Sequence, residues 1–222
     1  MDWTSLTLSL ELAVWTVAIL LPVSVLGGRW LAYGRFRAKG AVEALVMLPL
    51  VLPPTVFGFY LLLAFGRNSP VGAFWQETFG HQLVFTFEGL VVASVIFNLP
   101  FAIQPAQRGF EAIAVDLREA AATCGMSPWR SLWKVELPLA WPGLMTAMVL
   151  TFAHTLGEFG IVLMVGGSIP GETKTVAIAI YDQVQGFDMQ GAGIMSAALV
   201  AISFSAIAIT YGLSARVGRR LA

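Results

Sequence analysis

The sequence predicts an all-α integral membrane protein, a single transmembrane domain over residues 1–222 with about five membrane-spanning helices. Composition is the first indication: 57% of the residues are hydrophobic and 12% are charged, whereas a soluble domain is closer to half apolar and a quarter charged. Length is the second, because five segments reach the roughly 20 apolar residues that a bilayer crossing requires. The mean hydropathy of +0.77 agrees with both observations.

The five predicted spans are separated by short polar segments. In chain order they cover Leu6–Leu26, Ala41–Phe65, Leu83–Ala106, Leu139–Val165 and Gly191–Leu213. The first span lacks a basic segment before it and is long enough to cross a bilayer, so we expect a membrane helix rather than a cleaved signal peptide.

Basic residues predict the orientation of these spans. Of the 13 Lys and Arg residues, only Arg67 and Lys174 fall on one side of the predicted membrane. The others lie between spans one and two, between spans three and four, or in the tail with Arg216, Arg219 and Arg220. Because positive charge stays in the cytoplasm, we expect the N-terminus outside and the C-terminus inside the cell. The net charge of zero does not favour nucleic acid as a partner.

Span two contains three prolines, Pro49, Pro53 and Pro54, followed by Thr55. Proline lacks the N–H that an α-helix needs and disturbs the preceding turn. Broken membrane helices often border a substrate path. Pro53, Pro54 and Thr55 are therefore gate or pathway candidates, and a kink that only shapes packing is the alternative.

Span four contains an acidic residue, Glu158, with Gly157 and Gly160 on either side and Thr155 one turn before. A carboxylate inside a membrane is costly, so a functional role is the first hypothesis. These four residues are predicted to form a gate or hinge, and the alternative is a hydrogen-bonded carboxyl that fixes a helix crossing. His154 lies four residues before Glu158 and could face it, but two side chains are too few for a metal site.

The loop over residues 111–138 is polar and carries both signs of charge. It predicts two short helices, Leu117–Cys124 and Pro128–Glu136, joined by a hinge at Gly125. Leu137-Pro138 and Pro142 are expected to end the second helix and start span four. Such a folded element suits a partner protein, and an amphipathic loop lying on the bilayer is the alternative.

The spacing in this loop resembles the cytoplasmic signature of ABC importer membrane subunits. The signature residues are Glu119, Ala120, Ala121, Gly125, Val135, Leu137 and Pro138, with valine at position 135 where isoleucine is usual. The resemblance implies a type I importer-like bundle whose cytoplasmic coupling helices dock on an ABC ATPase. It also implies a homodimer with two ATPase copies that bind ATP and Mg²⁺, so this chain needs no cofactor and is not itself an enzyme.

Further segments narrow the resemblance to molybdate permeases. They are Leu48–Val56, Leu156–Gly160, Ser168–Thr175 and Ala177–Tyr181, with Ser168 where asparagine is usual. The resemblance implies that an extracytoplasmic binding protein delivers molybdate to a passage that works by alternating access. Tungstate and sulfate or thiosulfate stay open as cargo.

The passage is expected to be weakly polar, because every basic residue is assigned to a loop or tail. Hydroxyls and amides could line it, or could bond to their own helices instead; the candidates are Thr55, Ser94, Asn98, Thr146, Thr151 and Thr155. The segment 175–186 predicts a short amphipathic helix that contacts the delivery protein or covers the gate. An ion-coupled carrier or channel is the alternative from another class, and a membrane enzyme would need more ionisable groups in the spans.

Overall fold

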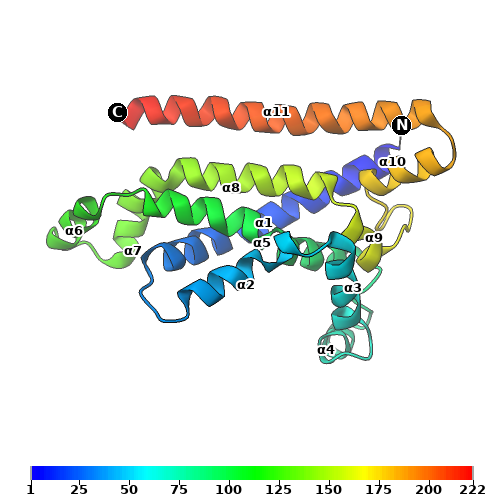
Figure 1. Cartoon of the computed structure of the whole chain (residues 1–222), viewed down its shortest axis with the longest axis horizontal. Coiled ribbons are helices and arrows are strands. Elements are labelled where there is room, and N and C mark those ends of the chain that lie inside the picture. Colours follow the sequence, from blue (N-terminus) through cyan, green and yellow to red (C-terminus); the bar gives the residue numbers. More distant parts are fainter. Residues whose placement is uncertain (1, 222) are drawn as a thin grey trace.

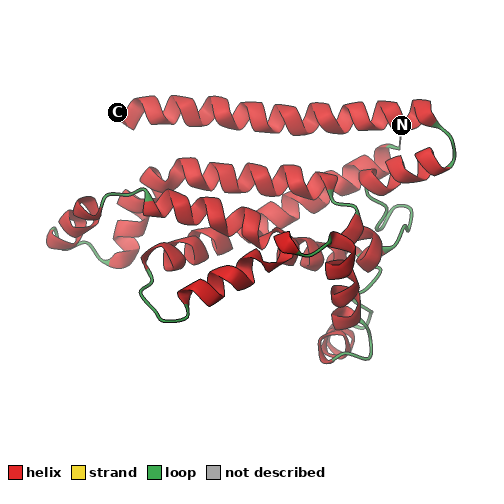
Figure 2. Ribbon diagram, in the orientation of Figure 1, coloured by secondary structure: helices red, strands yellow, loops and turns green. Residues whose placement is uncertain are grey.

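The computed structural model describes the backbone of residues 2–221 and the side chains of residues 2–209. The predicted basic tail residues Arg216, Arg219 and Arg220 therefore have side chains outside the described range. Within that range the chain is helical, with no strand, and its long helices run side by side in an elongated bundle (Figures 1 and 2). The 34–38 loop and the 111–138 loop lie at one end of this bundle, at the left in Figure 1, which we name the basic end.

The first and third spans are uninterrupted helices. Helix α1 (Trp3–Tyr33) is longer than predicted because Asp2 caps it, accepting a 3.1 Å hydrogen bond from the Ser5 N–H, and because it continues through Pro22. Helix α5 (Phe87–Glu111) starts later than predicted because Thr86 caps it through the N–H of Gly89. A polar cap thus sets each start more sharply than the apolar run does.

The second span is broken, as its prolines predicted. Helices α2 (Lys39–Val51) and α3 (Pro54–Phe65) meet at an angle of 109°. Neither Pro53 nor Pro54 has an N–H to continue the α2 hydrogen bonds. Helix α3 therefore turns away from the bundle and carries the short helix α4 (Pro70–Phe79) at its far end (Figure 1).

The fourth span differs from the prediction at both ends. It is not one helix over Leu139–Val165, because helix α8 (Leu137–Gly157) stops before an extended Glu158 and helix α9 (Gly160–Gly166) follows. It also does not begin afresh at Leu137-Pro138, since one continuous helix runs from Pro128 to Gly157. A π turn before Pro138, in which the Leu137 N–H reaches the Leu132 carbonyl, keeps the helix intact around the proline.

The last two helices close the fold. Helix α10 (Val176–Gln185) confirms the predicted short helix, and its apolar face is buried. Helix α11 (Met189–Leu221) packs against α8 and α10 and lies along the outside of the bundle (Figure 1). By length and composition the described chain has four helices able to cross a membrane, or five when α2 and α3 count as one span, which agrees with the prediction.

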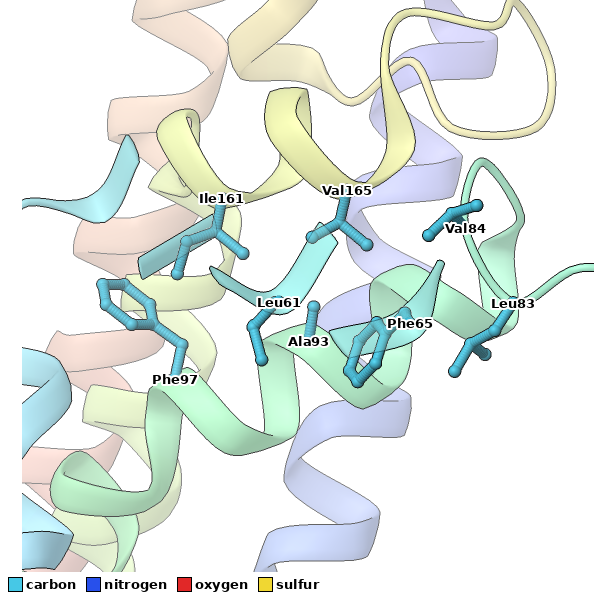
Figure 3. Close-up of a cluster of buried hydrophobic side chains, with 8 residues drawn as sticks. All are labelled: Leu61, Phe65, Leu83, Val84, Ala93, Phe97, Ile161 and Val165. Carbon is cyan, nitrogen blue, oxygen red and sulfur yellow. The ribbon is translucent and has the colours of Figure 1, made fainter. Parts of the chain in front are cut away.

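A hydrophobic cluster joins the two broken spans. Figure 3 shows side chains from α3, α5, α9 and the loop before α5 packed together: Leu61, Phe65, Leu83, Val84, Ala93, Phe97, Ile161 and Val165. Helices α3 and α9 approach so closely at Gly58 that a Cβ there would lie 2.9 Å from the Cβ of Met164. The two breaks are therefore held against each other at the end of the bundle opposite the basic end.

Candidate functional site

The 111–138 loop folds as two helical pieces, close to the predicted bounds. Helix α6 (Val115–Thr123) is followed by helix α7 (Pro128–Ser131), which runs through the π turn η1 (Leu132–Glu136) into α8. Together they form a projection at the basic end of the bundle (Figure 1). The second piece is thus an extension of a membrane helix, so a force on it acts directly on α8.

Gly125 forms the hinge between these pieces in a conformation that suits glycine. Its φ is +73°, its N–H donates to the Ala122 carbonyl at 2.9 Å, and the Met126 N–H donates to the Ala121 carbonyl at 3.1 Å. These two bonds make a Schellman motif, in which a left-handed residue ends a helix and satisfies its last carbonyls. Ser127 then caps α7 through the Arg130 N–H.

The signature residues are divided between the surface and the interior. Glu119, Ala120 and Gly125 are exposed, and Pro138 is exposed at the start of α8. Ala121 is buried, and Val135 and Leu137 are half-buried. The exposed members give the tip of the loop a surface of small side chains with one carboxylate, while the buried members attach it to the bundle.

A second group of polar side chains surrounds the break in span four. The residue Glu158 is 5% exposed, and its carboxylate accepts hydrogen bonds from the Ser94 hydroxyl at 3.0 Å and the Asn98 amide nitrogen at 2.6 Å. His154 Nδ1 lies 3.0 Å from Asn98 Oδ1 and 3.6 Å from Glu158 Oε1, so the predicted facing of His154 and Glu158 is confirmed. Among the described residues, no group of three His, Cys, Asp or Glu side chains could hold a metal ion.

Most of the predicted gate residues meet around one pocket. A cavity of about 340 Å³ is lined by Pro54, Thr55, Gly157, Glu158 and Gly160, together with Phe97, His154, Phe159 and Ile161. A Cβ on Gly160 would lie 3.0 Å from the Pro54 Cβ and 3.2 Å from the Thr55 nitrogen, so the two broken spans touch here.

Two predicted gate residues lie elsewhere. Pro53 is exposed at the break and does not line this pocket, and Thr155 is buried with its hydroxyl bonded to the Thr151 carbonyl at 2.8 Å. Thr146 likewise donates to its own helix, at the Pro142 carbonyl. For these threonines the alternative reading, a bond to the helix backbone, is the observed arrangement.

The sequence reading missed several contacts that organise these sites. Ser94 and Asn98 are predicted to line a polar passage, whereas both donate hydrogen bonds to Glu158. The sequence signal for this shared contact is their spacing, because they lie one helical turn apart on α5. An ion pair between Arg29 and Glu136 was also missed. Its signal was the position of Glu136 in the buried stripe of Leu132, Ala140 and Leu144.

Relatives of known sequence resemble this chain along most of its length. It is 48% identical over 210 residues to the "Molybdenum transport system permease protein ModB" of Azotobacter vinelandii, covering 95% of this chain and 93% of that one. It is 34% identical to the protein of the same description in Escherichia coli K12, over 83% of this chain and 80% of that protein. It is also 32% identical to a "Probable sulfate transport system permease protein cysT" of Chlorella vulgaris, over 76% of this chain and 63% of that one.

Solved structures share the fold at lower identity. A chain of a bacterial ABC transporter involved in the import of alginate superimposes with a TM-score of 0.78 at 15% identity, covering 96% of this chain and 78% of its own length. A chain of the inward-facing MetNI methionine ABC transporter gives 0.69 at 19% identity, over 97% and 94%. The fold is therefore that of ABC importer permeases. Residues 24–222 match the family described as "Binding-protein-dependent transport system inner membrane component", and the chain belongs to that family.

Proposed function

We propose that this chain is the permease subunit of an ATP-driven importer that moves molybdate across the inner membrane. The observation that carries the cargo is the 48% identity to the molybdenum permease of Azotobacter vinelandii over 95% of the chain. The observation that supports the mechanism is the 111–138 loop, whose folded tip continues into membrane helix α8.

In this proposal the loop is the contact point for a cytoplasmic ATPase. Two copies of the chain form a homodimer, so that two loops meet two ATPase subunits, and the N-terminus lies outside the cell. ATP and Mg²⁺ bind to those partners. Coupling then requires that the ATPase contacts around Glu119 and Gly125 differ between the two states of the transporter.

The gate in this proposal is the contact between the two broken spans. Alternating access would part Gly160 from Pro54 and Thr55, which now touch across the pocket. No Lys or Arg lines this pocket, so a dianion would find no permanent cation to hold it there. The passage would therefore release its cargo readily, and an extracytoplasmic molybdate-binding protein would supply affinity and selectivity.

Reconstitution tests this function directly. The chain is placed in liposomes with its ATPase and binding protein, and ATP hydrolysis and uptake are measured with molybdate, tungstate and sulfate in turn. Stimulation by molybdate-loaded binding protein and not by sulfate supports the proposal. The identity to the Chlorella vulgaris sulfate permease favours sulfate as the second candidate, and stimulation by sulfate alone would change the cargo and keep the mechanism. Uptake driven by an ion gradient without an ATPase would favour a carrier.

Substitution in the loop tests the coupling role. Glu119→Lys reverses the exposed charge, and Gly125→Trp adds a large side chain at a position where a Cβ would meet no atom within 4 Å. We expect both variants to insert normally and to lose uptake and ATPase association. Gly80→Trp after α4, where φ is also positive at +78° and a Cβ also has open space, is the matched control because it carries the same backbone strain. Normal uptake by both loop variants would contradict the coupling role.

A further inference from the structure

An ion pair between the partly exposed Arg29 and the buried Glu136 connects the first membrane helix to the 111–138 loop. Arg29 on α1 donates through Nε to Glu136 Oε2 at 2.6 Å and through Nη2 to Oε1 at 3.0 Å. The Ser131 hydroxyl donates to the same Oε1 at 3.1 Å. This bidentate geometry fixes both the distance and the angle between an arginine and a carboxylate. It therefore holds α1 and η1 in one relative orientation.

Glu136 occupies a position where an apolar side chain would pack. It is 2% exposed, and it follows Leu132 and precedes Ala140 and Leu144 in one buried stripe of the η1–α8 helix. Those three residues belong to the hydrophobic cluster in which α1, α5 and α8 meet. A charge at such a position is costly unless it is paired. Packing alone therefore does not account for glutamate here, and a directional link between helices does.

The same end of α1 also contacts α6, the first helical piece of the 111–138 loop. Tyr33, one turn after Arg29, lies under the Arg118 guanidinium of α6, whose central carbon is 3.4 Å from the ring centroid. The Tyr33 hydroxyl donates to the Phe110 carbonyl at 3.3 Å, which fixes the ring against α5. Helix α6 itself buries only Ala121 among its own residues. Its position thus depends on few contacts, of which Arg118 on Tyr33 is one.

We propose that Arg29 and Tyr33 form a two-point clamp that makes α1 and the 111–138 loop move as one body. Arg29 binds Glu136 in the second helical piece of the loop, and Tyr33 contacts Arg118 in the first helical piece. The inference rests on the proposed function, because it assigns these side chains the task of carrying loop motion into the membrane. Glu136 is a positioning residue in this scheme: it touches neither cargo nor ATPase, and acts through Arg29.

The rigidity of the clamp can be measured without cargo. Cys124 is the only cysteine of the chain, and it is exposed at the end of α6. A nitroxide attached to it reports the motion of the loop by electron paramagnetic resonance, with the full chain in nanodiscs. We expect Glu136→Gln and Tyr33→Leu to increase label mobility. Arg108→Gln removes an exposed ion pair with Glu111 at 2.8 Å and is the control expected to leave it unchanged. Unchanged mobility in both clamp variants would overturn the proposal.

The transmission of loop motion to the membrane helices is measured in the reconstituted complex as the amount of cargo imported per ATP hydrolysed. Glu136→Gln should lower this ratio at least about fivefold, the scale of an ordinary coupling energy, with basal hydrolysis nearly unchanged. The exchanged pair Arg29→Glu with Glu136→Arg should restore most of the ratio, which a general folding defect would not allow. A normal ratio in Glu136→Gln, or a loss of hydrolysis equal to the loss of uptake without restoration, would overturn the transmission role. If the unaltered complex imports nothing, the proposed function is wrong. The clamp is then tested only by the mobility of the label at Cys124, which does not depend on transport.

Discussion

The two buried glutamates of the membrane helices are held by different chemistry at opposite ends of α8. At the basic end, Glu136 is paired with a guanidinium through two hydrogen bonds. At the other end, Glu158 is held by a serine hydroxyl and an asparagine amide, with a histidine 3.6 Å away. Their burial is similar, at 2% and 5% exposure, so the partners make the difference.

Because of this difference, the contact between Arg29 and Glu136 is fixed, whereas the contacts of Glu158 can rearrange. A guanidinium stays charged at any physiological pH, so the Arg29–Glu136 link is permanent and its loss leaves a charge unpaired. Neutral donors satisfy Glu158 without charge, and their hydroxyl and amide groups can change partners at modest cost. The backbone agrees: η1 and α8 form one continuous helix at the basic end, whereas the chain is extended and broken at Glu158.

The largest expected effect comes from the helix crossing near the basic end. A Cβ on Gly143 would lie 2.6 Å from the Pro105 carbonyl oxygen and 2.7 Å from the Gly109 Cα, and backbone atoms cannot move aside. We expect Gly143→Val to separate α5 from α8 and to destabilise the fold by about 3 kcal/mol or more. The yield of monodisperse protein in size-exclusion chromatography measures this. Gly193→Val, with open space around its Cβ, should behave as the unaltered chain.

Removing the charge from each glutamate in turn tests the comparison itself. Glu136→Gln leaves Arg29 without its anion and should cost about 3 kcal/mol, the lower end for a broken buried pair because Arg29 is partly exposed. Glu158→Gln keeps an acceptor for Asn98 and should cost only about 1 kcal/mol. Unfolding midpoints in mixed detergent micelles give both values. Equal losses would mean that the two sites are not distinguished by the charge of their partners.

A smaller loss of stability is expected from a substitution at the contact between the two broken spans. Gly160→Ala places a methyl group 3.0 Å from the Pro54 Cβ and 3.2 Å from the Thr55 nitrogen, which α3 must accommodate. We expect a stability loss of about 1 kcal/mol together with slower uptake. Gly193→Ala on α11, where a Cβ has no atom within 4 Å and which does not line the pocket, is the control. Similar uptake in the two variants would argue against a gate at Gly160.

The most local effect, similar in size to that at Gly160, is expected at the hinge of the 111–138 loop. Gly125 has open space around it, so an added side chain meets only the strain of its φ of +73°. Gly125→Ala should therefore destabilise the loop by about 1 kcal/mol, and Gly125→Asn by less because asparagine tolerates this conformation. The mobility of a label at Cys124 compares them. An equal effect of alanine and asparagine would point to lost contacts instead of strain.

Much of this architecture follows from local sequence. Apolar runs of sufficient length predicted the membrane helices, Pro53 and Pro54 predicted the break in span two, and Gly125 between two polar helical segments predicted the hinge. The break in span four was only implied by Gly157 and Gly160, and the prediction of one helix over Leu139–Val165 was wrong. Glycine permits a break without requiring one, and the packing of α9 against α3 is a long-range contact that no local pattern contains.

By itself, the sequence determined that the chain spans a membrane, where its helices run and which loop carries the importer signature. These properties depend on residues near one another in the chain, namely apolar length, proline and glycine positions, and motif spacing. The tertiary structure alone decided that Arg29 meets Glu136 across 107 residues and that Glu158 meets Ser94 and Asn98. A buried carboxylate must find a partner, and which partner it finds depends on which helices lie beside it.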